Sequence, residues 1–457
     1  MGIPFVYPTG TTIYKKDKCW NGYTLMPFDK KGTALINMNG KVVHFWKDTF
    51  PMPAKMLPNG HVLTCLGERD KKFGYQDHND LTELDWDGNV IWSFDSFQEL
   101  NDDGNVFNSA RQHHDYQIEG NPVGYYVPGQ ECRTDFNKIL LLCHDDVRRR
   151  DISPQLLIDD VLIEINREGE ILWRWNALDH FDEYGFSNEE KLAIFRDPNT
   201  QKRGAEGLGD ILHLNTASYL GENRFHDAGD RRFKPDNIIL NSREGNLAFI
   251  IDHETGEAVW KIGPNYADDK NGTLMGMHNV HMIPRGLPGE GNILAFDNGG
   301  MTGYGAPDEF SATGLKVHRR DYSRVVEFDP VTMEIVWSFS AADLGYPSPL
   351  HAHYFYSPFI SNAQRLPNGN TLITEGVSGI VMEVTNEKEV VWEYVVPGLG
   401  DIGIYRSYRV PYSWVKNLEI PQETDVIPPE NSEFHLPGAD DPSIREEVTV
   451  SIKLNNL

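Results

Sequence analysis

Residues 81–94 read LTELDWDGNVIWSF, and this stretch decides the fold. Two runs of alternating apolar residues flank Asp87-Gly88, one of the dipeptides that favour the short turns joining antiparallel strands. The second run ends at Trp92. The segment therefore predicts a β-hairpin whose outgoing strand carries a tryptophan.

The same pattern recurs along the chain, and self-similarity at this scale is typical of repeat folds. Six copies combine an apolar pair, a polar position, a turn and two further apolar residues before a tryptophan, and they end at Trp46, Trp92, Trp173, Trp260, Trp337 and Trp392. A second turn-and-strand segment precedes most of them, at residues 57–65, 118–127, 237–242, 291–297 and 366–374. Two hairpins per repeat predict a four-stranded blade.

Isolated blades cannot bury both faces, whereas radial stacking covers each face and leaves few exposed edges. We therefore predict an all-β, six-bladed β-propeller. Before Trp46 there is room only for the outer part of a blade, while residues 405–415 still alternate like a strand. This favours ring closure by N- and C-terminal strands. We assign residues 1–416 to a catalytic propeller and residues 417–457 to an acidic C-terminal extension.

The spacing between the tryptophans is uneven, which indicates insertions that decorate one rim of the propeller. They are residues 95–110, 145–158, 176–210 and 299–321. Within the third insertion, NEEKLAIF after Ser187 predicts a helix.

The charge balance limits the partners. The chain has 42 Lys and Arg against 68 Asp and Glu, a net charge of −26 that opposes contact with nucleic acid or an anionic membrane. A small anion can still be held by converging Arg and His side chains, because salt screens distant charges over about 8–10 Å. We predict no nucleic-acid or membrane partner, and homo-oligomer formation stays open.

The chain shows no signal-peptide pattern and no apolar run of about 18 residues, which predicts a cytoplasmic protein, or a periplasmic one if a signal was removed. The four cysteines, Cys19, Cys65, Cys132 and Cys143, show no CxxC spacing and are typical of reduced structural thiols.

Histidines recur at the start of the innermost strand expected in successive blades. These strands begin in residues 110–117, 210–219, 275–284 and 357–367, and the histidines are His113 or His114, His213, and His278 with His281 nearby. A structural role is the alternative for any one of them. Equivalent positions in consecutive blades should converge on the axis, and imidazole can exchange protons or bind a ligand near neutral pH. We predict a shared site.

A second layer of polar residues follows the next strand of each blade. It lies in CHDD (143–146), NSRE (241–244), FDNGG (296–300) and TEGVSG (374–379). Arg243 and Arg324 are planar donors suited to oxyanions, with pairing to a blade carboxylate as the alternative. We assign substrate binding to His114, Arg243, Asn298 and His351.

The segment HAHYFYSP places His351 and His353 on one side of an expected strand, a spacing that could serve a metal. Zinc sites need three or four ligands, however, and no HExxH or cysteine-rich signature occurs. We predict no metal and no cofactor.

Six segments together resemble the arylsulfotransferase, or aryl-sulfate sulfotransferase, family over roughly residues 5–415. They are WNGYTLMPFD (20–29), GDILHLNTASYL (209–220), residues 238–263 around NSREGN, residues 277–300 from MHNVHM to FDNGG, SRVVEFD (323–329) and AQRLPNGNTLITEG (363–376). The resemblance implies a six-bladed propeller that transfers a sulfuryl group from a phenolic sulfate ester to a phenolic acceptor without a nucleotide donor.

The resemblance also implies site residues. The family's channel histidines fall on His213 and His278, and its channel arginine falls on Arg324. A sulfated histidine would be the intermediate, but the blade segment NTLITEGVSGIVMEV (370–384), where the family's nucleophile is expected, contains no histidine. His353, or His351 beside it, could substitute. The predicted catalytic set is therefore His213, His278, Arg324 and His353, acting on a small aromatic or sulfated substrate.

Two other classes of function remain open at this point. A histidine cluster could serve a hydrolase or lyase on an anionic substrate, with or without a bound cation. A propeller with a polar axis could also bind a ligand without catalysis.

Overall fold

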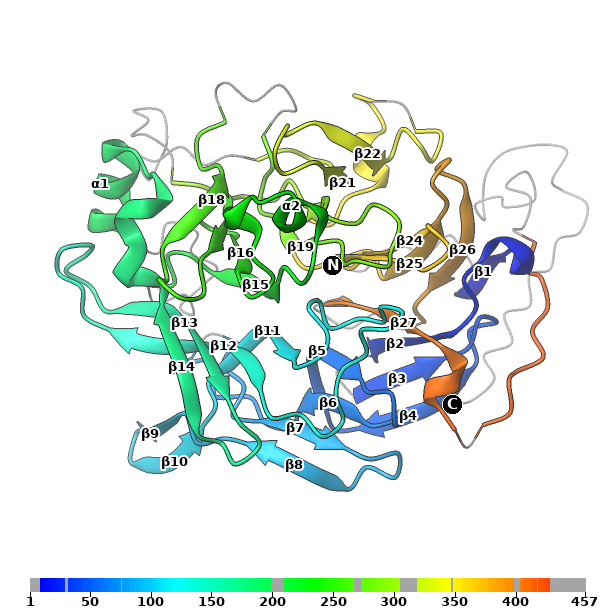
Figure 1. Ribbon diagram of the computed structural model, residues 1–457, viewed down its shortest axis with the longest axis horizontal. Coiled ribbons are helices and arrows are strands. Elements are labelled where there is room, and N and C mark those ends of the chain that lie inside the picture. The colour runs from blue at the N-terminus through cyan, green and yellow to red at the C-terminus, as the bar shows by residue number, and fades with distance from the viewer. Residues whose placement is uncertain are drawn as a thin grey trace, which may run out of the picture.

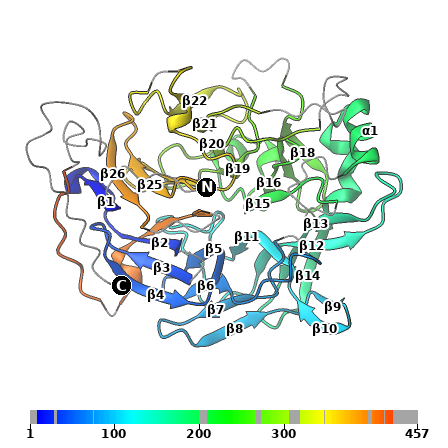
Figure 2. The same ribbon diagram turned by 180° about the vertical axis from the view of Figure 1, so that it is seen from behind.

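The computed structural model describes residues 9–28, 32–74, 76–198, 209–266, 273–304, 319–346, 348–397, 403–416 and 418–427. Within them, six antiparallel sheets of four or five strands stand around a common centre (Figure 1), as the view from behind also shows (Figure 2). The predicted six-bladed β-propeller is confirmed.

Four blades are built from four consecutive strands each, which follow one another from the axis outward. Blade 1 is β5 Phe50–Met56, β6 Val62–Cys65, β7 Leu81–Leu84 and β8 Val90–Phe94; blade 2 is β11 Gln112–Ile118, β12 Ile139–Val147, β13 Leu157–Ile165 and β14 Ile171–Asn176; blade 3 is β15 Leu214–Tyr219, β16 Ile238–Ser242, β17 Leu247–Ile251 and β18 Ala258–Ile262; blade 4 is β19 His278–Met282, β20 Ile293–Asp297, β21 Arg324–Phe328 and β22 Ile335–Ser340.

The chain closes the ring by sharing strands between its two ends. Blade 5 is β23 Asn362–Arg365, β24 Thr371–Glu375, β25 Ile380–Val384 and β26 Val390–Val395, with β1 Gly10–Tyr14 added outside; blade 6 is β27 Tyr408–Val410, β2 Tyr23–Phe28, β3 Gly32–Ile36 and β4 Val42–Lys47. The C-terminal strand β27 is thus the inner strand of the blade that the N-terminal strands complete. The predicted ring closure is confirmed.

The hairpin at residues 81–94 forms as its sequence predicts. Its turn runs from Asp85 to Asn89, where Gly88 adopts a φ of 84° that favours glycine. The Asp85 carboxylate accepts the backbone N–H groups of Asp87 and Asn89 at 2.9 and 2.8 Å. An Asx-type turn therefore fixes the register of β7 and β8.

Tryptophan indoles join each blade to the next. In every blade one Nε1–H donates to a backbone carbonyl in the outer hairpin turn of the following blade, over 2.7–3.0 Å. The pairs are Trp46 with Asp85, Trp92 with Arg167, Trp175 with Gly256, Trp260 with Pro330, Trp337 with Asn386, and Trp392 with Met38. The last pair returns to blade 6, so the repeated tryptophan is the device that locks the ring. In blade 2 the donor is Trp175 and not Trp173, the tryptophan that ends the repeat.

The insertions decorate one rim, as predicted. Because the strands of a blade are antiparallel, one side of the propeller carries the starts of the first and third strands and the ends of the second and fourth. All four insertions lie at these strand ends. The first contains the hairpin of β9 Gln98–Asp102 and β10 Asn105–Ser109. The third contains the 3₁₀ helix η2 Ala177–Tyr184 and the predicted helix α1 Asn188–Arg196, which begins with a Ser187 capping box. Residues 199–208 and 305–318 of the insertions lie outside the described residues.

The remaining helices are short. They are η1 Lys16–Lys18, α2 Arg224–Asp227, η3 Arg231–Phe233, η4 Ala352–Tyr354 and η5 Tyr412–Trp414. Across the described ranges, no helix has the length and apolar character needed to cross a bilayer. The cytoplasmic location stays a prediction.

The connection between β11 and β12 crosses the ring at the end opposite the insertions and reaches toward its middle (Figure 1). Its Tyr125 hydroxyl lies 3.0 Å from Nε2 of His281, and its Tyr126 ring stacks at 5.2 Å on Trp20, which precedes β2. This connection packs across the far end of the axis.

The start of the predicted C-terminal extension packs on the propeller. Val426 forms a bridge with Tyr14, and the Glu423 carboxylate accepts the backbone N–H of Met38 at 2.8 Å. Residues 428–457 lie outside the described residues, so the domain boundary after residue 416 stays a prediction.

Candidate active site

The inner strands of blades 2 and 3 begin with a backbone irregularity that aims a histidine at the axis. His114 and His213 have φ values of 54° and 50°, a left-handed conformation that non-glycine residues rarely adopt. The strand register also shifts close to both residues, between Gln112 and Tyr116 around His114 and between Leu214 and Thr216 just after His213, as in a β-bulge. Bulges often lie next to active sites, where they change the direction of a side chain. The irregular backbone at these positions is therefore consistent with a functional role for the two histidines.

The predicted convergence of histidines is observed for three blades. The rings of His114 and His213 meet edge to face with centroids 4.6 Å apart. His278, at the start of β19, is close enough to His213 and His114 for their charges to influence one another. We refer to His114, His213 and His278 as the axial histidines; all three are buried.

Asp210 orients the ring of His213. Its Oδ2 lies 2.5 Å from Nδ1 of His213, and its Oδ1 accepts the backbone N–H of the same residue at 3.0 Å. Burial opposes ionisation, but the contact with His213 outweighs it and holds the pKa of Asp210 below its ordinary value. A carboxylate on Nδ1 fixes the tautomer that carries its lone pair on Nε2, as in hydrolase triads.

Asn298 holds His278 through Nδ1 of the imidazole ring. The Asn298 side chain donates to the carbonyls of Ser357 and Ile360 at 2.7 and 2.8 Å, which fixes its Oδ1 as the partner of His278 Nδ1 at 2.8 Å. Nε2 of His278 accepts the backbone N–H of Ile360 at 3.2 Å. Burial, followed by the charge of Arg243, keeps the pKa of His278 well below its ordinary value, so the ring is neutral. Asn298 thus positions a predicted site histidine.

Arg243 brings a buried cation to the axial histidines. Its backbone N–H donates to the carbonyl of His213 at 3.2 Å, and its charge is the strongest that acts on His278. The residue is only 2% exposed; Nη1 pairs with Glu244, whereas Nε and Nη2 have no hydrogen-bond partner among the described residues. Unsatisfied buried donors are costly, so these two nitrogens mark a place for an acceptor.

Arg324 pairs with a carboxylate of its own blade. It lies on β21, the third strand from the axis, and its Nε donates to Asp297 Oδ2 at 2.7 Å. Its side chain is 18% exposed. The alternative of pairing with a blade carboxylate is the one observed, because the third strand is set back from the centre.

His351 and His353 are also placed differently from the expectation. His351 precedes the 3₁₀ helix η4 and His353 lies within it, so neither is on a strand, and both are exposed while Ala352 between them is buried. Their ring contacts are with Tyr354, at centroid distances of 5.8 and 4.7 Å. The structure does not bring them to the axial histidines.

A buried ion group fills the axis next to the histidines, and the sequence reasoning missed it. Lys55 Nζ lies 2.7 Å from Asp115 Oδ1, and Arg406 Nη1 lies 3.0 Å from Asp115 Oδ2. These residues come from blades 1, 2 and the segment before β27. Asp210 was missed as well, although it stands three residues before His213 in the segment GDILHLNTASYL.

A surface cavity of about 550 Å³ lies on the rim, apart from the axial histidines. Residues from η2, α1 and the segment near Arg149 line it, among them Leu178, Lys191 and Phe195. Its place on an insertion makes it a feature of the rim and not of the axis.

Comparison with known proteins adds a family assignment. A family model described as arylsulfotransferase (ASST) matches residues 53–396. Among curated proteins, none matches the chain.

Solved structures resemble the chain only distantly. A protein of unknown function from Bacteroides caccae is 11% identical with a TM-score of 0.42, over 85% of this chain and 99% of that one. The Dos1 propeller is 10% identical with a TM-score of 0.34, over 86% and 74%. Virginiamycin B lyase from Staphylococcus aureus is 11% identical with a TM-score of 0.31, over 86% and 85%. These values carry no inference about activity.

Proposed function

Because the chain belongs to the arylsulfotransferase (ASST) family, we propose that it transfers a sulfuryl group from a phenolic sulfate ester to a phenolic acceptor at the axial histidines. The observation that carries the proposal is the buried guanidinium of Arg243, with two unpartnered nitrogens beside His213 and His278. Planar guanidinium donors match the oxygens of a sulfate group.

His213 is the nucleophile in this proposal. Asp210 holds Nδ1–H, so the lone pair lies on Nε2, on the side of the ring away from the carboxylate. In the first step Nε2 forms a bond to sulfur and the ester S–O bond breaks, with the electron pair leaving on the phenolate. Asp210 stabilises the positive charge that develops on the imidazole.

In the second step the acceptor phenol oxygen attacks sulfur and the N–S bond breaks. The phenolic proton passes to Nε2 of His213, and its later release to solvent restores the neutral ring. Arg243 stabilises the sulfuryl oxygens in both transition states. Burial and the charge of Arg243 keep His278 neutral, and Asn298 holds its orientation, so this ring forms one wall of the site without adding a competing positive charge.

An acceptor-dependence assay tests the proposal. Purified chain is incubated with 4-nitrophenyl sulfate with and without phenol, and both nitrophenolate and phenyl sulfate are measured. We expect nitrophenolate release that depends on phenol, with phenyl sulfate formed in equal amount. Release that is equal without phenol would instead indicate a hydrolase, and no release with any of several aryl sulfates would contradict the proposal.

His213→Ala and the exposed His226→Ala form a matched pair for this assay. We expect the first to abolish transfer and to remove any sulfated peptide from residues 209–220 in mass spectra of the quenched reaction. The second should behave as the unchanged chain.

A further inference from the structure

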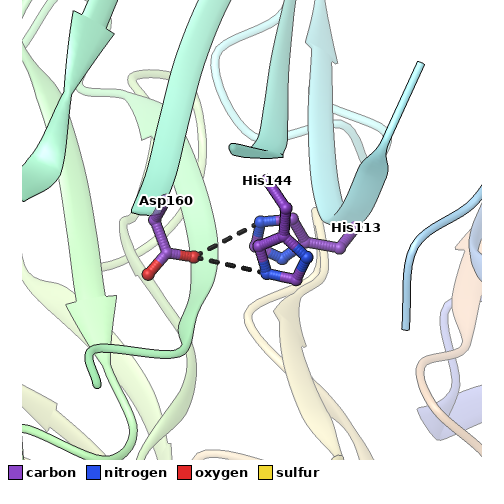
Figure 3. Close-up of side chains that lie close together, drawn as sticks. All are labelled: His113, His144 and Asp160. Carbon is purple, nitrogen blue, oxygen red and sulfur yellow. Dashed lines mark ion pairs between the residues drawn. The ribbon is translucent and has the colours of Figure 1, made fainter. Parts of the chain in front are cut away.

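Three ligand-type side chains of blade 2 converge (Figure 3). His113, His144 and Asp160 each offer one atom, and these atoms lie within 4.8 Å of one another. His113 Nε2 is 3.3 Å and His144 Nε2 is 3.8 Å from Asp160 Oδ1. All three side chains are buried. We call these residues the blade-2 triad.

The strand register fixes the triad. His113 lies on β11, His144 on β12 and Asp160 on β13, which are adjacent strands of one sheet. His144 and Asp160 are direct cross-strand partners, so their side chains stand on the same face of the blade. Three neighbouring strands therefore deliver the ligands, which is a more rigid support than a loop.

The three converging atoms have no hydrogen-bond partner among the described residues. His113 Nε2, His144 Nε2 and Asp160 Oδ1 are all buried and unsatisfied. Such atoms cost free energy unless they meet an acceptor, a donor or an ion. Three of them within 4.8 Å of one another require a common explanation.

The opposite side of each ligand is occupied. Asp77 Oδ1 lies 2.6 Å from His144 Nδ1, and Asp77 Oδ2 accepts from Arg111 and Arg69 at 2.9 and 3.2 Å. This arrangement places the proton on Nδ1 and the lone pair of His144 on Nε2, facing Asp160. Carboxylate-bound histidines of this kind are the usual support of metal ligands.

His113 and Asp160 contact other groups on the sides away from the triad. His113 Nδ1 lies 2.8 Å from Nδ1 of His114, so a proton donated by His113 in this contact leaves its lone pair on Nε2. Asp160 Oδ2 accepts the backbone N–H of Leu214 at 3.2 Å, which leaves Oδ1 for the triad.

We propose that the blade-2 triad binds a divalent transition-metal ion, with Zn²⁺ as the best match. Two imidazole nitrogens and one carboxylate oxygen are a donor set that zinc accepts, and three protein ligands leave a coordination position open. The proposal departs from the expectation that the chain binds no metal. It does not depend on the proposed sulfuryl transfer.

Binding requires a small adjustment of the side chains. The rings of His113 and His144 are stacked at 3.6 Å with an angle of 18° between them, so their lone pairs run side by side. Ligand bonds of about 2.0–2.2 Å need ligand atoms roughly 3.3 Å apart, less than the 4.8 Å limit of the triad. One imidazole must turn about its Cβ–Cγ bond, which leaves the strands in place. The side chain of Asp146, two residues beyond His144 on the same strand, is 37% exposed.

The test uses the full chain after treatment with a chelator and dialysis. Zn²⁺ is titrated in competition with a chromophoric chelator, and Co²⁺ is added separately to record its visible absorption. We expect one equivalent of Zn²⁺ to bind and Co²⁺ to show the bands of a site with nitrogen and oxygen ligands. A chain that binds no equivalent of either ion contradicts the proposal without the need for any variant.

Variants then locate the ion. His113→Ala, His144→Ala and Asp160→Asn should each weaken Zn²⁺ binding at least 100-fold, and Asp77→Asn, which acts through His144, should weaken it about 10- to 100-fold. His351→Ala combined with His353→Ala is the control and should leave affinity unchanged. Far-UV circular dichroism identifies any variant that fails to fold, and only folded variants are compared. Unchanged affinity in folded His113→Ala and His144→Ala places the ion elsewhere and overturns the proposal.

Discussion

Asp210 Oδ2 lies 2.5 Å from Nδ1 of His213, a contact made within a single segment of the chain. The carboxylate sets the tautomer of the ring and compensates charge on it. The proposed chemistry depends on this pair more than on any other contact, because the pair decides which nitrogen attacks.

Asp210→Asn should therefore reduce acceptor-dependent turnover by about 100-fold or more, since an amide can hold the ring in the wrong tautomer. The measurement is the initial rate of 4-nitrophenolate release with saturating donor. Asp230→Asn, at an exposed pair with Arg232, is the control and should leave the rate unchanged. Equal rates in both variants would remove Asp210 from the mechanism.

Arg243→Gln should raise KM for the aryl sulfate by about 10- to 100-fold, because it removes one or two charge-assisted hydrogen bonds. Arg243→Lys should give a KM between those of the unchanged chain and Arg243→Gln, since lysine keeps the positive charge but lacks the planar guanidinium. Arg324→Gln is the informative comparison and should change KM little, because Arg324 is paired with Asp297 on an outer strand. If Arg324→Gln has the larger effect, the assignment of the anion site to Arg243 is wrong.

Glu375→Gln should stabilise the protein more at pH 8 than at pH 5. Burial raises the pKa of Glu375 to about 7, so the folded state holds this proton more tightly than the unfolded state does. Its contribution to stability is present at low pH and is lost as the pH rises toward and through 7. The amide can still accept from Tyr356 N–H and Ser378 Oγ–H. Urea unfolding at the two pH values should show a difference of about 1–3 kcal/mol, and a pH-independent effect would contradict it.

Asp115→Asn should destabilise the protein by about 3–5 kcal/mol, because it leaves Lys55 and Arg406 as buried cations without a carboxylate. Urea unfolding followed by tryptophan fluorescence gives the free energy. Asp103→Asn, at the exposed pair with Lys72, should stay within about 0.5 kcal/mol. A loss below about 1 kcal/mol for Asp115→Asn would mean that the two cations find other partners.

The architecture was predictable because it is repeated six times, and each copy couples a turn to a tryptophan. Ring closure followed from the unequal ends of that pattern. The convergence of His213 and His278 was predictable for the same reason. The starts of the inner strands of all blades lie at the axis, and this does not depend on the length or conformation of the loops.

The misplaced residues show where sequence periodicity fails. His351 and His353 alternate around Ala352 as in a strand, but a 3₁₀ turn with one buried methyl gives the same alternation. Arg324 and Arg243 both lie near the same rim, and only the strand order, third against second, separates them.

Contacts between residues of different blades could not be predicted from the sequence. Asp77 meets His144 across 67 positions, and Lys55 meets Asp115 across 60. Nothing in either local segment marks these pairs, because each residue alone reads as an ordinary polar position near a turn.

Strand β27 imposes an order of assembly on the propeller during translation. Blades 2, 3 and 4, which carry the axial histidines, are fully synthesised before residues 408–410 leave the ribosome, whereas β2 to β4 must wait for them. In the nascent chain the ring is therefore still open, and the edge of β2 that will pair with β27 is unpaired. In newly made protein the axial histidines should therefore be in place early. The last blade is completed late, so resistance to proteases and release from chaperones should also come late.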